Sequence, residues 1–435
     1  MLSQIDTRTL GNGLRLICAP YINDTISKFA VLQVFVKSGP RFENSKFSGI
    51  GHFVEHLLFR GCAEYPSSTE LNAHFETLGD GLQGATTREY SNYSIEVPRE
   101  NLEAAIRALG LLFSGPLLKE IETEKGIVFE EIQEELDEQG SENLLENVSR
   151  SMIYGSEPVA KPILGRKPSV GALTSEDVRH FFNHFYAPSQ MIVVCAGAVN
   201  ESDFFYWGEK YLSFASKFPT GDFSGLEGSY PVHGTFVGPR LYYLEESSSQ
   251  IETLISFRGF SESEPEFFSQ LFLERLLDDG LSSRLQRSLC ENRGLLYDIN
   301  ASTDTLSICG LFEVSFRVSD RNLSEVIDLI LEEFEKLQSE LIPEAEFEKV
   351  QARLSREADQ LFERAGIWGI RLGEIELFDL PLPKNLADWK ARFRAVSRED
   401  IQDLARRLFN PANRVIGLQG KLRKGRFLKL EKQLT

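Results

Sequence analysis

Two histidines and a glutamate lie close together in segment 49–59, which reads GIGHFVEHLLF. Its apolar residues recur with helical period, which predicts a helix. His52 and His56 are four residues apart, so both imidazoles project from one face, with Glu55 beside His56. This is the H-x-x-E-H spacing of inverted zincins, in which the histidines hold zinc and the carboxylate acts as general base. We therefore expect His52 and His56 to be metal ligands and Glu55 to be catalytic.

The simpler alternative is a helix that happens to carry two histidines and a solvated glutamate. The chain has only six histidines, so this pattern is unlikely to arise by chance. His180 and His184 provide an internal comparison, because they have the same spacing within RHFFNH. No acidic residue lies between them and aromatic residues surround them, so we interpret this second pair as part of a packed structural helix.

A zinc site of this kind needs a third protein ligand. The first half of the chain contains one strongly acidic segment with helical period, 120–138. Glu124 and Glu131 are seven residues apart and share a face of that helix. They lie next to an apolar stripe that we expect to face the core, formed by Ile127, Val128, Ile132 and Leu136. The residues alone narrow the third ligand to the glutamates of this helix and favour this pair, without choosing between its two members.

The composition is that of a folded globular protein of two or three domains. The 435 residues are 42% hydrophobic and 26% charged. The net charge of −18 repels nucleic acid and anionic membrane surfaces, so we expect neither as a partner. The five cysteines are scattered and form no C-x-x-C, which indicates reduced thiols. With no recognisable signal peptide or apolar span, we expect a cytoplasmic protein.

A short internal repeat divides the chain. Segment 97–106 reads VPRENLEAAI and segment 318–327 reads VSDRNLSEVI, an offset of 221 residues. Each copy follows a strand-like run and leads into a helix-period segment. We predict an α+β fold of two similar domains from this repeat, each an antiparallel-rich sheet with helices packed on one face. The metal-bearing domain would span 1–215, a linker 216–234, and a domain without the metal motif 235–435.

The sequence resembles the pitrilysin/insulinase family of zinc metallopeptidases, and most of all its branch of mitochondrial processing peptidase subunits and bacterial relatives. The family signature is H-x-x-E-H followed about 75 residues later by Glu, and His56 and Glu131 are 75 residues apart. The resemblance makes Glu131 the third ligand and Glu124 its supporting carboxylate. It implies one zinc ion per chain and an endopeptidase that cuts peptides or unfolded segments in a closed chamber. Each chain would then form half of a clamshell dimer.

The resemblance extends into the second half, where SSRLQRSLCENRGLLY is similar to the family segment that ends in a substrate-contacting tyrosine. It makes Tyr297 a catalytic residue that steadies the tetrahedral intermediate. The family places an arginine seven residues earlier, where this chain has Cys290. We therefore expect the metal-bearing subunit of a homodimer or of a heterodimer whose partner carries the Arg–Tyr pair. The alternative is a non-catalytic structural or partner subunit of the same family.

The resemblance also assigns substrate contacts to an edge strand of the first domain. An extended peptide would add to it as a further strand. Gln83 and Gly84 stand where the family has Asn-Ala, which would shift the contacts to the substrate. Cys62 occupies a position where the family often has threonine, and we interpret it as a buried small residue rather than a ligand. The expected substrate-binding residues are Gln83, Gly84, Ala85 and Thr86.

Overall fold

The computed structural model describes residues 5–21, 27–137, 140–215 and 240–434. The chain divides into two compact units, each made of separate segments. The first unit comprises Met1–Glu134, Lys161–Ser229 and Asp359–Asn385, and the second comprises Glu135–Ala160, Tyr230–Ala358 and Leu386–Thr435. The expected linker 216–234 lies outside the described residues, and the division of the chain at that point stays a prediction.

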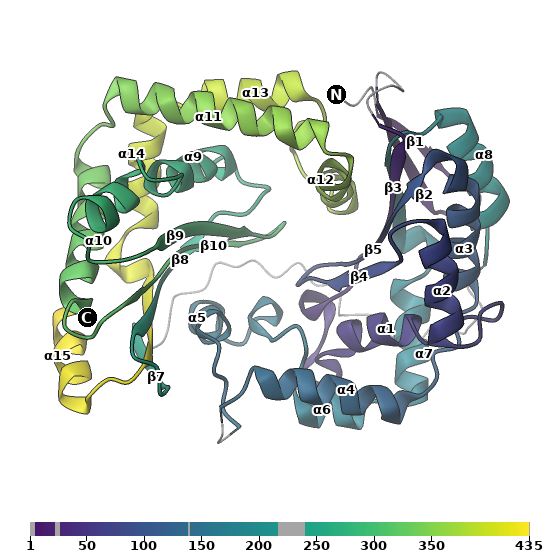
Figure 1. Ribbon diagram of the computed structural model, residues 1–435, viewed down its shortest axis with the longest axis horizontal. Helices are drawn as coiled ribbons and strands as arrows, with labels where there is room; N and C mark the ends of the chain where they lie inside the picture. The colour runs from purple at the N-terminus through teal and green to yellow at the C-terminus, as the bar shows by residue number, and fades with distance from the viewer. Residues whose placement is uncertain (1–4, 22–26, 138–139, 216–239, 435) are drawn as a thin grey trace. The chain divides into compact units, whose positions relative to one another are not determined.

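The first unit is built on a six-stranded sheet with the order β1-β2-β6-β3-β5-β4 (Figure 1). Neighbouring strands are antiparallel except for β2 and β6, which are parallel. The central strands are rich in Val, Ile, Leu and Phe, and every residue of β6 is buried. The strands are β1 (Asp6–Thr9), β2 (Arg15–Pro20), β3 (Phe29–Val36), β4 (Gln83–Thr86), β5 (Ser91–Pro98) and β6 (Met191–Gly197).

Helices cover this sheet on one face, as expected, and one further helix lies on the other. Leu32 and Val34 of β3 line an apolar space together with Ile106 and Leu109 of α3. The α-helices of the unit are α1 (Ile50–Leu58), α2 (Ser68–Leu78), α3 (Leu102–Ser114), α4 (Ile121–Glu134), α6 (Lys167–Ala172), α7 (Ser175–Phe185), α8 (Glu201–Leu212) and α12 (Ala365–Leu377). Short 3₁₀ turns are η1 (Pro40–Phe42), η2 (Ser45–Phe47), η3 (Arg99–Asn101) and η5 (Pro188–Gln190).

Helix α12 comes from the second half of the sequence and packs on β3 and β6. Gln33 Nε2 donates a hydrogen bond to the Gly366 carbonyl at the start of this helix. A Cβ atom at Gly369 would clash with Gln33, and one at Gly373 would clash with the ring of Phe35. Since Gln33 and Phe35 alternate with Leu32 and Val34 along β3, α12 lies on the opposite face of the sheet from α3.

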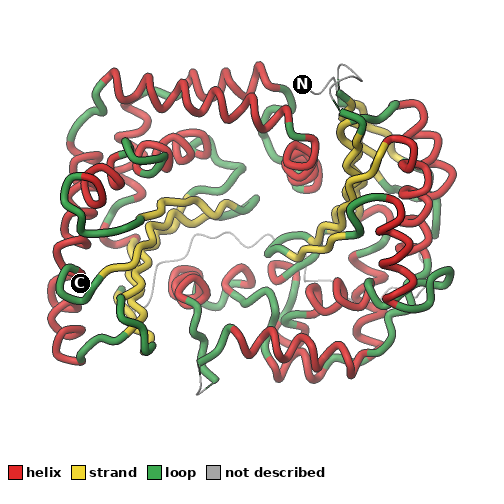
Figure 2. Tube along the Cα trace, viewed as in Figure 1, coloured by secondary structure: helices red, strands yellow, loops and turns green. Residues whose placement is uncertain are grey.

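The second unit has a five-stranded sheet with the order β7-β11-β8-β10-β9. Figure 2 shows its helices grouped around the strands. The strands are β7 (Leu241–Glu245), β8 (Ile251–Gly259), β9 (Ile299–Thr305), β10 (Gly310–Val318) and β11 (Arg414–Gly420). The helices are α5 (Leu145–Tyr154), α9 (Phe267–Leu277), α10 (Leu323–Ser339), α11 (Glu344–Glu363), α13 (Leu386–Ala395), α14 (Arg398–Leu408) and α15 (Lys424–Leu434), with the short η4 (Pro158–Ala160), the π-helix η6 (Gln286–Glu291) and η7 (Pro411–Asn413).

The two sheets have the same topology, which confirms the α+β fold and the internal repeat. Without β1, the order β2-β6-β3-β5-β4 matches β7-β11-β8-β10-β9 strand by strand, and both sheets begin with a parallel pair. Even the helix caps repeat, since Thr174 with Asp177 and Ser397 with Asp400 form capping boxes before α7 and α14. Helix α9 corresponds to α1 but contains no histidine. No helix in the described ranges is long and apolar enough to cross a membrane.

Candidate metal centre

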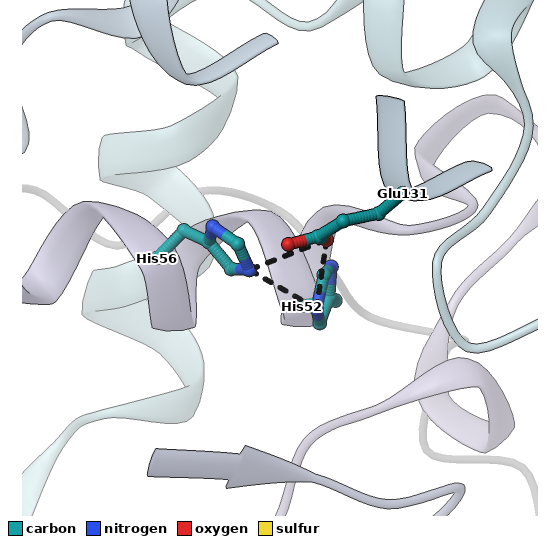
Figure 3. A group of neighbouring side chains, drawn as sticks. All are labelled: His52, His56 and Glu131. Atoms are coloured by element: carbon teal, nitrogen blue, oxygen red, sulfur yellow. Dashed lines mark hydrogen bonds and ion pairs between the residues drawn. The ribbon is translucent and has the colours of Figure 1, made fainter. Parts of the chain in front are cut away.

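Two helices of the first unit carry the expected metal ligands. Helix α1 follows Gly49, whose φ of +91° suits glycine, and it presents His52 and His56 one turn apart. Helix α4 packs against α1 and carries Glu131 (Figure 3).

The apolar stripe expected on α4 is confirmed only in part. Val128 and Ile132 of α4 are buried as expected, but Ile127 is 40% exposed. The reason is that Ile127 is offset by one residue, about 100°, from Val128 around the helix.

Three donor atoms meet between these helices. His52 Nε2 lies 3.2 Å from His56 Nε2. Glu131 Oε2 lies 3.7 Å from His52 Nε2 and 3.5 Å from His56 Nε2. A tetrahedral zinc ion with bonds of about 2.1 Å holds its donors about 3.4 Å apart. The three atoms are therefore spaced as three corners of a zinc tetrahedron, which leaves the fourth corner for water or substrate.

The chemical state of these groups also fits a divalent cation. Glu131 Oε2 is buried and makes no hydrogen bond in the described part of the chain, which is unfavourable for a carboxylate oxygen without a positive partner. Burial, reinforced by the neighbouring His56, lowers the pKa of His52 to about 3. His52 is therefore neutral near pH 7, and the neutral imidazole is the form that binds metal. Within the described residues these three are the group able to hold a metal ion.

Glu124 occupies a different place from Glu131. It is buried and its Oε1 lies 2.8 Å from His56 Nδ1, while Arg60 pairs with its other oxygen. Burial acts to raise the pKa of Glu124, but hydrogen bonds from His56 and Arg60 outweigh it and lower that pKa. Burial acts to lower the pKa of His56, but the carboxylates of Glu124, Glu131 and Glu55 outweigh it and raise that pKa. A carboxylate only accepts, so the contact with Glu124 places a proton on His56 Nδ1, and release of the Nε2 proton leaves a lone pair for metal. The geometry thus supports the expected supporting role for Glu124.

Glu55 lies in α1, between His52 and His56, and its side chain faces β4 of the sheet. Its side chain is only slightly exposed, and Thr86 Oγ1 donates a 2.5 Å hydrogen bond to Glu55 Oε2. Burial raises the pKa of Glu55, Thr86 and His56 oppose this shift, and Glu131 adds to it. A carboxyl with a raised pKa close to a metal site is suited to accept and return a proton.

The expected substrate-binding residues form strand β4, which lies at the edge of the first sheet. Gln83, Gly84 and Ala85 are exposed and β4 pairs with β5 along its other edge. A Cβ atom at Gly84 would lie 2.8 Å from Glu55 Oε1, so this strand passes directly beside the expected general base. An open strand edge next to the site can pair with an extended peptide.

The remaining predicted residues are not among the three that form the metal-binding group. Tyr297 belongs to the second unit and is fully exposed, and its catalytic role stays a prediction. Cys290 lies in η6, and partial burial raises the pKa of its thiol. Nearby Arg293 faces Glu325 at 3.9 Å. Cys62 is fully buried, as expected, and is not in the metal-binding group.

Two residues around the site were not anticipated from the sequence. Arg60 lies in the turn just after α1, four residues beyond His56, and a helical reading of this spacing could have placed it beside His56 and its partner Glu124. Glu43 accepts hydrogen bonds from the backbone of Gly49 and Gly51 at the start of α1. No local sequence signal identifies it, because Glu43 belongs to no capping motif and lies upstream of the helix.

The fold and this cluster define a metallopeptidase-type architecture, and comparison with known proteins specifies it. The model described as "Insulinase (Peptidase family M16)" matches residues 20–167, and "Peptidase M16 inactive domain" matches residues 172–354. Together these ranges cover most of the chain. The chain belongs to peptidase family M16, and its recognition from the motif spacing is confirmed.

Relatives with curated names agree with this membership. The chain is 25% identical over 403 residues to "Uncharacterized zinc protease YmxG" of Bacillus subtilis, covering 92% of this chain and 95% of the relative. It is 26% identical over 366 residues to "Mitochondrial-processing peptidase subunit beta" of Saccharomyces cerevisiae, covering 80% and 76%. The crystal structure of a protease from Helicobacter pylori has the same fold, with a TM-score of 0.85 and 20% identity, covering 97% of this chain and all of that one.

Proposed function

We propose that this chain is a zinc-dependent endopeptidase that hydrolyses peptides or unfolded polypeptide segments. The observation that carries the proposal is the triangle of His52 Nε2, His56 Nε2 and Glu131 Oε2, whose sides of 3.2, 3.5 and 3.7 Å suit one zinc ion. The names of the zinc protease relatives support the choice of metal.

Each residue of the site has a distinct task in this proposal. Zinc bound by His52, His56 and Glu131 would polarise the scissile carbonyl and lower the pKa of the attacking water. Glu55 takes a proton from that water and delivers it to the leaving amine. Thr86 holds the Glu55 carboxylate through its hydroxyl. The free edge of β4 aligns the substrate backbone as an added strand.

The proposed active species is a dimer in which this chain is the metal-bearing catalytic subunit. Cys290 stands where the resemblance calls for an arginine, and a thiol cannot supply a permanent cationic donor. A heterodimer with a homologous subunit that carries the Arg–Tyr pair would supply that donor. The Saccharomyces cerevisiae relative, which is itself named as a subunit, supports this proposal.

A non-catalytic role is the second candidate. Residues 172–354 match a model described as an inactive domain, and Cys290 departs from the expected arginine. A non-catalytic subunit has no need of a zinc site, whereas here three donors converge at zinc-like distances. Zinc content therefore separates the two candidates: His52→Ala should abolish binding of one zinc per chain, and His180→Ala, in the partly exposed pair of α7, should not.

The test of catalysis is hydrolysis of a mixed peptide library by the zinc-loaded chain. We expect Glu55→Gln to reduce the rate at least 10³-fold while zinc remains bound. Glu130→Gln is the matched control, because Glu130 is exposed on α4 next to Glu131. Equal rates for Glu55→Gln and the wild type would reject the mechanism. A zinc-loaded wild type that cuts nothing alone should be tested again with a homologous subunit that carries the Arg–Tyr pair.

A further inference from the structure

The two histidine ligands differ in what fixes their orientation. His56 Nδ1, the nitrogen that does not face the other ligands, lies 2.8 Å from Glu124 Oε1, and this contact orients the ring. His52 Nδ1 is buried and has no hydrogen-bond partner within the described residues. Metal-binding histidines are ordinarily oriented through the nitrogen that does not bind metal. The position of His52 therefore depends on the backbone of the first turn of α1, where it lies.

Glu43 holds this first turn from outside the helix. Its Oε2 accepts a 2.7 Å hydrogen bond from Gly49 N–H, and its Oε1 accepts a 2.9 Å bond from Gly51 N–H. The first N–H groups of a helix have no partner within the helix, so each needs an acceptor from elsewhere. Gly51 directly precedes His52 in the sequence. The Glu43 carboxylate thus fixes the backbone next to the first ligand.

The surroundings of Glu43 leave this contact little freedom. The side chain is almost completely buried, and Lys161 Nζ donates a 2.7 Å hydrogen bond to the Glu43 carbonyl. A Cβ atom at Gly51 would lie 2.9 Å from Glu43 Oε1 and 3.2 Å from Gly39 N. The first turn of α1 therefore packs tightly against the Glu43 carboxylate and against the backbone of Gly39.

This cap differs in kind from four side-chain caps of α-helices elsewhere in the described residues. Ser67, Thr174, Asn200 and Ser397 are short polar side chains that accept a hydrogen bond from the third residue after them. Glu43 instead reaches six and eight residues along the chain and brings a carboxylate into the interior. Burying a carboxylate is unfavourable, and burial raises the pKa of Glu43 to about 7, against the opposing effect of both backbone hydrogen bonds and Lys161.

We propose that Glu43 is a positioning residue for the metal centre, which fixes His52 by holding the Gly49 and Gly51 N–H groups. This inference rests on the proposed zinc site and adds a residue to its machinery. Glu43 touches neither metal nor substrate and acts through the backbone of α1. Its loss should therefore weaken zinc binding more than the loss of an equivalent helix cap far from the site.

The experiment is a zinc titration of the full chain against a competing chelator at pH 8, where Glu43 is ionised. Glu43→Gln keeps the size of the side chain but replaces one acceptor oxygen by an NH₂ group that faces a backbone donor. We expect its zinc Kd to rise about tenfold. Ser397→Ala, which removes the cap of α14, is the matched control and should keep its zinc Kd within twofold of the wild type.

Thermal unfolding shows which variants are folded at the titration temperature. Should Glu43→Gln fail to fold, Glu43→Asp takes its place, because the shorter side chain cannot reach both N–H groups and should also weaken zinc. A Glu43 variant that is folded and binds zinc as tightly as the wild type would overturn the inference. A wild-type chain that takes up no zinc would instead overturn the proposed function, so the two failures are distinguishable.

Discussion

His56 Nδ1 lies 2.8 Å from Glu124 Oε1, while His56 Nε2 faces His52 and Glu131. The His56 ring is thus held at Nδ1 by Glu124, and its Nε2 points to the other two donor atoms. The two glutamates of α4 that the sequence placed on one face act on different nitrogens of the same ring. Glu131 is therefore the glutamate placed to bind metal, and Glu124 is the glutamate that orients the His56 ring.

Removal of the Glu124 carboxylate should weaken the metal site without removing a ligand. In Glu124→Gln the amide can still accept from His56, but the negative charge that favours this tautomer and offsets Arg60 is lost. We expect the zinc Kd to rise 10- to 100-fold. Chelator competition measures this change, with Glu130→Gln as control. An unchanged zinc Kd in folded Glu124→Gln would contradict the role given to this residue.

The Thr86 hydroxyl should matter for the chemical step rather than for metal binding. It donates a 2.5 Å hydrogen bond to Glu55, and its own oxygen lies 3.2 Å from Ser91 Oγ. Thr86→Val keeps the shape of the side chain and removes the donor, so we expect kcat to fall about tenfold with the zinc Kd unchanged. Thr86→Ser should restore most of the rate. If Thr86→Val and Thr86→Ser have equal kcat, the hydroxyl has no such role.

Glu43 should make the stability of the first unit depend on pH. Its pKa is raised by burial to about 7 in the folded chain, from the usual 4.5. Between these values the folded state retains a proton that the unfolded state releases, so the contribution of Glu43 to stability is fully present below pH 4.5 and is lost as pH rises to about 7. The loss is on the order of 3 kcal/mol.

Thermal unfolding of wild type and Glu43→Gln, measured without zinc from pH 5 to pH 8, tests this linkage. The Gln side chain does not titrate, so the midpoint of the variant should fall less over this range than that of the wild type. Ser397→Ala should retain the wild-type pH dependence. Parallel pH profiles for wild type and Glu43→Gln would show that Glu43 does not titrate in this window.

A buried cation should be important for the second unit. Arg150 of α5 is 2% exposed and pairs with Asp304 of β9, near the buried carboxyl of Glu313. Arg150→Ala leaves a cavity and removes the positive partner, so we expect a loss of about 3 kcal/mol. Arg150→Met fills the space and should lose less. Calorimetric unfolding measures the free energy of unfolding of both variants. Equal losses in Arg150→Ala and Arg150→Met would mean that the packing of this side chain adds nothing to the effect of its charge.

The sequence by itself determined the parts that depend on local spacing. The interval between His52 and His56 places both on one helix face, whatever that helix packs against. The 75-residue interval to Glu131 pointed to the family, which the matching models confirm. The repeat between 97–106 and 318–327 likewise predicted two similar sheets, because the same pattern of strand and helix periods favours the same topology.

The sequence could not assign positions that depend on contacts between distant segments. Glu124 and Glu131 are equivalent by helical period. Only the packing of α4 on α1 places Glu124 at His56 Nδ1 and Glu131 at His56 Nε2. Glu43 was missed for the same reason, since its partners are backbone N–H groups that become a site only when η1, η2 and α1 fold together. The exposure of Ile127 also follows from packing and not from hydropathy.

Only the tertiary structure decided how the segments are shared between the two units. It was not anticipated from the sequence that α5 and α12 each cover a sheet formed mainly by the other half of the sequence. Gly369 and Gly373 allow α12 to lie on β3, and Leu145 and Ile153 of α5 join the apolar core of the second sheet. An amphipathic helix specifies that one face must be buried, and the sheet that buries it is chosen by complementary shape, which local sequence does not encode.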